Sequence, residues 1–128
     1  MLLTELYRRM TALLAEAGFT AWAADAVPPD AAFPFVTMEI TPAGSMHALG
    51  RVVLTGWPGK TCSMARRLAM ADALYAIVPS AGLKLPLENG LALLTRCSRA
   101  EMQWVASGGA TGVRIPLELR VMGGDAHA

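Results

Sequence analysis

The sequence of 128 residues contains few charges, with 16% charged against 54% hydrophobic residues. A disordered chain needs the opposite balance, so this composition indicates a folded protein. The formal net charge is +1, which gives no strong field to attract nucleic acid or an acidic membrane surface. A chain of this length has room for one hydrophobic core, and we expect a single domain over residues 1–128.

Long apolar runs are also missing. No stretch of the sequence reaches the roughly 18 uninterrupted apolar residues that a membrane-spanning helix needs. Near the start, Glu5, Arg8 and Arg9 stand where a secretory signal peptide has its apolar region. The sequence therefore predicts a protein that is not exported, does not act at a membrane and stays in the cytoplasm.

Residues that carry chemistry are sparse. Cys62, Cys97, His47 and His127 occur singly, without the close spacing of metal ligands or of a disulfide framework. The acidic residues are scattered, and neither histidine is placed to act as a base for a cysteine. We expect two reduced thiols, no metal, no cofactor and no catalytic residues, and hence a protein that is not an enzyme.

Two segments have the three- and four-residue apolar spacing of amphipathic helices. The first is residues 1–17, where Gly18 follows at the position of a left-handed cap. The second is residues 61–78, where Thr61 or Ser63 can cap the first turn. Both segments are predicted to pack an apolar face on a sheet.

The remaining segments favour strands. Residues 18–34 contain three prolines and predict an irregular connector, whereas residues 35–57 predict two strands. Residues 83–122 predict further strands, beginning with a short hairpin that turns at Asn89-Gly90. Residues 123–128 predict a frayed tail.

Together these elements predict an α+β fold in the order α-β-β-α-β-β. We expect an antiparallel four-stranded sheet plus the short hairpin, with two helices packed on one face. Pro116 cannot donate to a strand ladder, so the strand over residues 113–121 is predicted to lie at an edge or to have an unpaired stretch there.

The segment Gly-Trp-Pro-Gly-Lys-Thr at residues 56–61 resembles two phosphate-binding loops only superficially. A nucleotide-binding P-loop needs a glycine five positions before Gly59, and Leu54 stands there. As the loop of an RNA-binding KH domain, the segment would lack the backbone amide that Pro58 removes. We therefore predict a turn and a helix cap, with no specific nucleic-acid binding.

The low charge has a physical consequence for the surface. Soluble domains commonly carry about 25% charged residues, and at 16% some apolar surface is expected to be covered by another chain. Homo-oligomers hide such surface in their interfaces. An alternative is that the low charge merely reflects an alanine-rich composition.

The sequence resembles the tail terminator, or tail completion, proteins of long-tailed bacteriophages and prophages. The resemblance runs over nearly the whole chain. It lies in Phe33-Pro34-Phe35-Val36 and in the segments GRVVLTGW (50–57), ARRLAMADALYAIV (65–78) and TGVRIPLELRV (111–121). It also lies in the order of an N-terminal helix, a proline-rich connector, two strands, a helix and a β-rich last third.

The resemblance implies a structural protein of the virion tail, assembled in the bacterial host cytoplasm. Such proteins form a ring, commonly a hexamer, that stops polymerisation of the tail tube and joins it to the head connector. The implied partners are further copies of the chain, the tail tube protein and the head–tail connector protein. Our candidate contact residues are Arg66, Arg67, Leu85, Leu87, Asn89, Ile115 and Leu117.

Two alternatives stay open at the level of sequence. One is another head–tail connector or a minor tail protein, which would share the size and the mixture of helix and strand. The other is a small α+β domain unrelated to phages that binds a ligand or nucleic acid.

Overall fold

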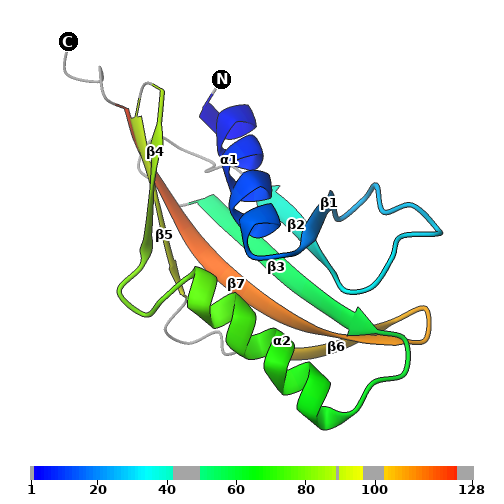
Figure 1. The fold of residues 1–128 in the computed structure, drawn as a ribbon. Coiled ribbons are helices and arrows are strands. Elements are labelled where there is room, and N and C mark those ends of the chain that lie inside the picture. Colours follow the sequence, from blue (N-terminus) through cyan, green and yellow to red (C-terminus); the bar gives the residue numbers. More distant parts are fainter. Residues whose placement is uncertain (1, 42–49, 89, 97–102, 124–128) are drawn as a thin grey trace.

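The computed structural model describes residues 2–41, 50–88, 90–96 and 103–123 (Figure 1). In these ranges the chain forms two helices and seven strands. In chain order they are α1 (Leu2–Glu16), β1 (Thr20–Ala23), β2 (Phe35–Thr41), β3 (Gly50–Gly59), α2 (Met64–Ile77), β4 (Leu83–Leu87), β5 (Gly90–Arg96), β6 (Gln103–Ser107) and β7 (Ala110–Gly123).

The strands form one mixed sheet in the order β1-β2-β3-β7-β5-β4. β1 runs parallel to β2, and the other described pairs are antiparallel. β7 pairs with β3 along one edge, while two shorter strands share its other edge. β6 pairs with Ala110–Arg114 and β5 with Leu117–Gly123.

The predicted order α-β-β-α-β-β, with a four-stranded antiparallel sheet and a separate hairpin, is therefore wrong. The connector contributes a strand, because residues 20–23 pair with residues 35–38 of β2. The short hairpin of β4 and β5 is not separate, since β5 pairs with the second half of β7. The β-rich segment predicted over residues 83–122 contains four strands, β4, β5, β6 and β7, the last of which ends at Gly123.

The position of Pro116 follows from this arrangement. β7 is an internal strand, so it is not the edge that the proline suggested. Ile115 and Pro116 pair with β3, and on the other side they fall between the residues paired with β6 and those paired with β5. Pro116 thus lies where β7 is unpaired on one side, and a missing N–H on that side costs no ladder hydrogen bond.

Both helices lie on the same face of the sheet (Figure 1). The core forms between them and the side chains that alternate toward that face, such as Val52 and Leu54 of β3 and Leu117 of β7, all fully buried. α1 contributes Leu6, Met10 and Leu14, and α2 contributes Met70, Ala71 and Leu74. Neither helix of the described residues lies on the opposite face of the sheet.

Local signals set the helix ends. Gly18 has a φ of 93°, and Phe19 N–H donates to the carbonyl of Leu14, so α1 ends in a left-handed cap. Ser63 Oγ accepts a hydrogen bond from Arg66 N–H at 3.2 Å, which caps the first turn of α2. Gly56 lies beneath α2, where a Cβ would come within 2.6 Å of Met70 Cγ. The absence of a side chain at Gly56 therefore allows α2 to pack close to the sheet.

Candidate interaction surfaces

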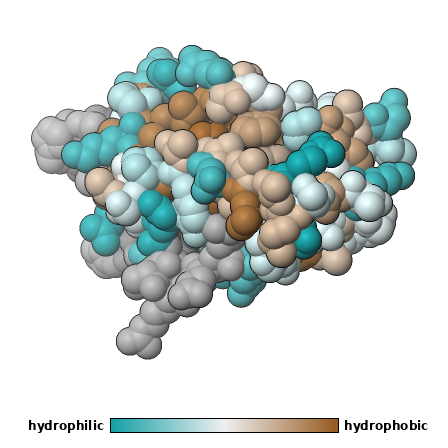
Figure 2. All heavy atoms as spheres, turned by 60° about the horizontal axis from the view of Figure 1, so that its bottom comes forward, coloured by the Kyte–Doolittle hydropathy of each residue, from teal (hydrophilic) through white to brown (hydrophobic). Residues whose placement is uncertain are grey.

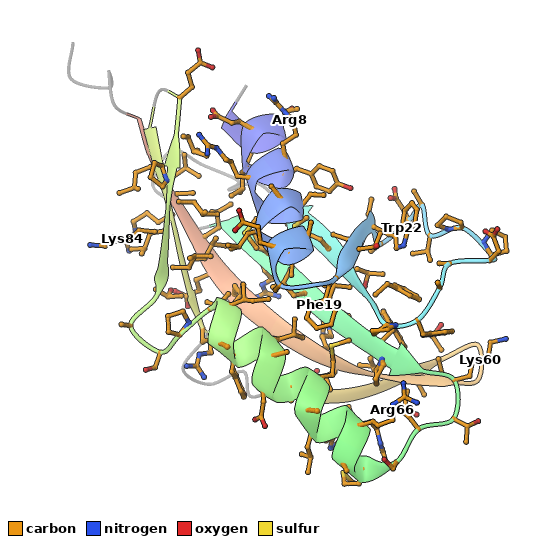
Figure 3. The ribbon with its side chains drawn as sticks, in the orientation of Figure 1. Arg8, Phe19, Trp22, Lys60, Arg66 and Lys84 are labelled. Atoms are coloured by element: carbon orange, nitrogen blue, oxygen red, sulfur yellow. The ribbon has the colours of Figure 1, made fainter. Side chains whose placement is uncertain are left out.

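The two arginines predicted as contacts lie in the first turn of α2, near the end of β3 (Figure 3 labels Arg66). Arg66 is exposed, and its Nη2 donates to the carbonyl of Pro58 at 3.0 Å. Arg67 is half-buried, with its guanidinium carbon 5.4 Å from the ring centroid of Trp104 in β6. Hydrogen bonding and stacking therefore hold both cations in place at this end of the helix.

The predicted leucine and isoleucine contacts have different surroundings. Ile115 and Leu117 are 4% and 0% exposed and belong to the core, because they alternate toward the helices on an internal strand. Leu87 is also buried, and Leu85 is half-buried against the core. Asn89 lies outside the described residues. Among the described members of the set, Arg66 is thus exposed, while Arg67 and Leu85 are half-buried.

Sequence reasoning missed an apolar surface beside Arg67. Met64 and Leu68 of α2 are 50% and 48% exposed, and Trp104 of β6 is 44% exposed. These three residues, with Arg67 stacked on Trp104, form what we call the α2 surface. Figure 2 turns the bottom of Figure 1 forward and shows apolar and weakly polar residues across the middle of that side.

The composition of α2 explains why this surface exists. Met70, Ala71 and Leu74 pack on the sheet, which accounts for one face of the helix. Met64 and Leu68 are four residues apart and lie beside Ala71 around the helix, so the apolar part of α2 is wider than the part that packs on the sheet. A signal was present in the sequence, because the apolar residues of this helix span a wider arc than one packed face needs.

A second candidate surface is a hollow between α1 and the sheet edge formed by β1 and β2. It is an open groove of about 660 Å³, which we call the α1–β2 groove. Leu3, Thr4 and Tyr7 line it from α1, residues 23–25 from the end of β1, and residues 38–40 from β2. Among the described lining residues, Asp25 and Glu39 are acidic and exposed, and none is basic.

The groove follows from the short length of β1. β1 pairs with β2 only as far as Met38, after which Ala24 N–H donates to the Met38 carbonyl and the chain turns away. Glu39 and Ile40 therefore continue β2 without β1 beside them. The sequence could not show this, because the connector was not predicted to form a strand.

The structure describes some of the cysteine, histidine and loop residues that could carry chemistry. Cys62 is a half-buried free thiol, whereas Cys97, His47 and His127 lie outside the described residues. The described part of the chain holds no group of three or more His, Cys, Asp or Glu that could bind a metal ion. Residues 56–59 of the supposed phosphate loop are the last part of β3, with an irregular register against β7.

Among the helices described here, none has the length and apolar character needed to cross a membrane. No protein-family model matches the chain, and no curated protein matches it either.

Proposed function

We propose that the protein is a structural subunit of a phage or prophage tail, of the tail terminator type. In this role copies of the chain form a ring on the end of the tail tube, which stops the tube from growing and offers a surface to the head connector. The proposal involves binding only and assigns no catalytic residue. Its support is the resemblance over nearly the whole chain together with one physical observation.

That observation is the exposure of the α2 surface. Met64, Leu68 and Trp104 are each about half exposed, in a chain with only 16% charged residues. Exposed apolar side chains that gather on one side mark surfaces that meet another protein. Aromatic residues, methionine and arginine are also the types enriched in the centres of interfaces. A subunit that works only in an assembly has a use for such a surface, whereas an isolated domain gains nothing from it.

Ring formation explains how one small chain could end a polymer. A head-to-tail contact repeated around an axis closes when its rotation divides the full circle. The closed ring then presents a different surface from that of the last tube layer, so the next tube subunit finds no matching site.

The direct test uses the tail tube protein encoded by the same phage or prophage. The purified chain is added during tube polymerisation, and tube lengths are measured by electron microscopy. We expect shorter tubes that carry the chain at one end only. Unchanged tube lengths with no bound chain would contradict the terminator role. Capture of a head-side adaptor in place of the tube protein would identify the chain as another connector.

A further inference from the structure

Backbone groups at the outer edge of β6 have no partner among the described residues. β6 pairs with β7 on one side, and no described strand lies on its other side. A glycine turn at residues 108–109, with φ of 56° and 81°, joins the two strands. Ser107 and Ala110 flank this two-residue turn, so they exchange both of their hydrogen bonds. Such pairs alternate along the ladder, and the N–H and C=O groups of Trp104 and Ala106 therefore point outward.

A second hairpin shows how an edge of this kind is protected. β4 and β5 are also joined by a two-residue turn, which lies between Leu87 and Gly90. Pro86, directly before Leu87, has no N–H to offer at the outer edge, and Lys84 is an exposed charge on the same strand. Proline and lysine on an edge strand keep other strands from pairing with it. Ala106 occupies in β6 the position that Pro86 occupies in β4, and β6 contains neither a charge nor a proline.

The exposed apolar side chains of α2 lie on the side of the helix that faces this edge. Tyr75 stacks with Arg96 at the end of β5, where the guanidinium carbon is 4.4 Å from the ring centroid. Leu68 and Met64 precede Tyr75 by seven and eleven residues, so they lie on the same side of α2. Trp104 points to the helix side of the sheet, because its partner in β7 is a fully buried core residue. The α2 surface thus lies over the strand whose edge is open.

We propose that two copies of the chain pair through β6, antiparallel about a two-fold axis at Val105, to form one continuous sheet. In this register Trp104 of each copy lies opposite Ala106 of the other, and both pairs use the hydrogen-bonding groups that point outward. The large indole lies beside a methyl group, and Gln103 lies opposite Ser107, so a polar residue meets a polar residue. The strand is therefore self-complementary, as a two-fold contact requires.

The same contact covers the α2 surface in both copies. A two-fold axis perpendicular to the sheet keeps the helices of both copies on one face. The two Trp104 side chains become diagonal neighbours on that face, which is within the reach of aromatic rings. Leu68 and Met64 of each copy lie beside them. A strand from another protein could use the same hydrogen bonds, but a second copy also brings a matching set of exposed apolar residues. We therefore assign the edge to a second copy.

The charges near the contact do not oppose it. β6 has none of its own. Arg67 stays stacked on the Trp104 ring of its own copy. Asp72 is exposed and lies between Arg67 and Tyr75 along α2, on the way toward β5 and away from Val105. Because the two-fold axis reverses the second copy, the two Asp72 side chains lie toward opposite ends of the contact.

The first experiment measures mass in solution by light scattering over a range of protein concentrations. We expect a wild-type dimer. Ala106→Pro removes an outward N–H in each copy and should raise the dissociation constant by about 30-fold, the effect of losing two interface hydrogen bonds. Lys84→Pro is the matched control, because it places the same residue at an outward position of β4, and it should leave the mass unchanged.

Circular dichroism and urea unfolding of each variant separate lost association from lost folding. If Ala106→Pro does not fold, Leu68→Asp takes its place, since it changes a side chain that is 48% exposed. It should raise the dissociation constant by at least about 10-fold. A wild-type chain that is monomeric at every concentration would overturn the inference, as would an assembly whose mass the folded variants leave unchanged.

The second experiment tests the register by disulfide formation in a chain whose two native cysteines are serine. Two Val105 residues at the axis form a pair without hydrogen bonds, in which the Cα atoms lie about 4.5 Å apart, within the range of a disulfide. We expect Val105→Cys to give covalent dimers on mild oxidation with diamide. Gln103→Cys, on the same strand and face, should give them only when mixed with Ser107→Cys. Equal yields from Val105→Cys and Gln103→Cys alone would overturn the register.

This inference goes beyond the proposed function and does not rest on it, because a two-fold contact closes with two copies whereas a ring needs a head-to-tail contact. The experiments keep the two apart. A monomeric chain that shortens the tubes would overturn the inference and leave the terminator role standing. A chain that pairs through β6 but leaves tube lengths unchanged would support the inference and contradict the terminator role.

Discussion

Replacing Gly56 with alanine tests how closely α2 packs on the sheet. A Cβ at this position lies 2.6 Å from Met70 Cγ, 2.8 Å from Met70 Sδ and 3.0 Å from Leu74 Cδ1. Carbon atoms in contact ordinarily lie about 3.5–4.0 Å apart, so the added methyl group overlaps its neighbour by about 1 Å. Met70 and Leu74 are 4% and 1% exposed and have no open space to enter. The helix or the methionine must therefore move.

The size of the effect follows from two opposing contributions. Overpacking a buried site lowers the free energy of unfolding by about 1–3 kcal/mol. Alanine also restricts the unfolded chain, which offsets about 0.4–1 kcal/mol of that loss. We expect Gly56→Ala to lower the free energy of unfolding by about 1–2 kcal/mol. Urea unfolding at one fixed protein concentration measures it, because self-association adds to apparent stability.

Gly59→Ala is the matched control in the same strand. Its Cβ would lie 3.7 Å from Arg66 Nη1 and 3.8 Å from Cys62 Cβ, which are ordinary contacts, so we expect no loss of stability.

Met70→Ala combined with Gly56→Ala provides a second check. The methionine variant removes the atoms that clash, so the double variant should be more stable than the sum of the single effects by about 0.5–3 kcal/mol. Close packing of α2 on Gly56 would be refuted if the Gly56→Ala variant were as stable as the wild type. It would also be refuted if the loss in the double variant equalled the sum of the two single losses.

Three further predictions concern single hydrogen bonds, the first two measured as a change in the free energy of unfolding and the third by hydrogen exchange. Ser63→Ala removes the cap of α2 and should cost about 1 kcal/mol, while Ser63→Asp should retain most of the stability. Trp57→Phe removes the Nε1–H donor to Thr37 Oγ1 at 3.2 Å and should cost about 0.5–1.5 kcal/mol; no change would show that the bond contributes nothing. Glu5→Ala frees the Glu88 N–H that it accepts from at 2.6 Å, and we expect faster hydrogen exchange at Glu88, which an unchanged rate would contradict.

The sequence alone predicted the features that depend on near neighbours. Ser63 caps α2 because its hydroxyl competes for a backbone N–H three residues ahead, and Gly18 ends α1 because it has no Cβ. The interruption at Pro116 also follows from a local cause, the absence of a backbone N–H. The low content of charged residues indicated exposed apolar surface, but not which residues form it.

The structure decided what depends on residues far apart in the chain. The connector gains a strand only because residues 20–23 find the free edge of β2, so local propensity gave an irregular segment. Ile115 and Leu117 changed from candidate contacts to core because their side chains lie on the face of the sheet that the helices cover.

The same division holds for the candidate site. The sequence determined that Arg66 and Arg67 start an apolar helix, since that is a matter of spacing along α2. Only the tertiary structure put Trp104 beside Arg67, because β6 reaches α2 through its pairing with β7. The α1–β2 groove likewise exists because β1 ends before β2 does, leaving side chains from three separate segments around one hollow. Such surfaces depend on long-range pairing, which no local pattern in the sequence specifies.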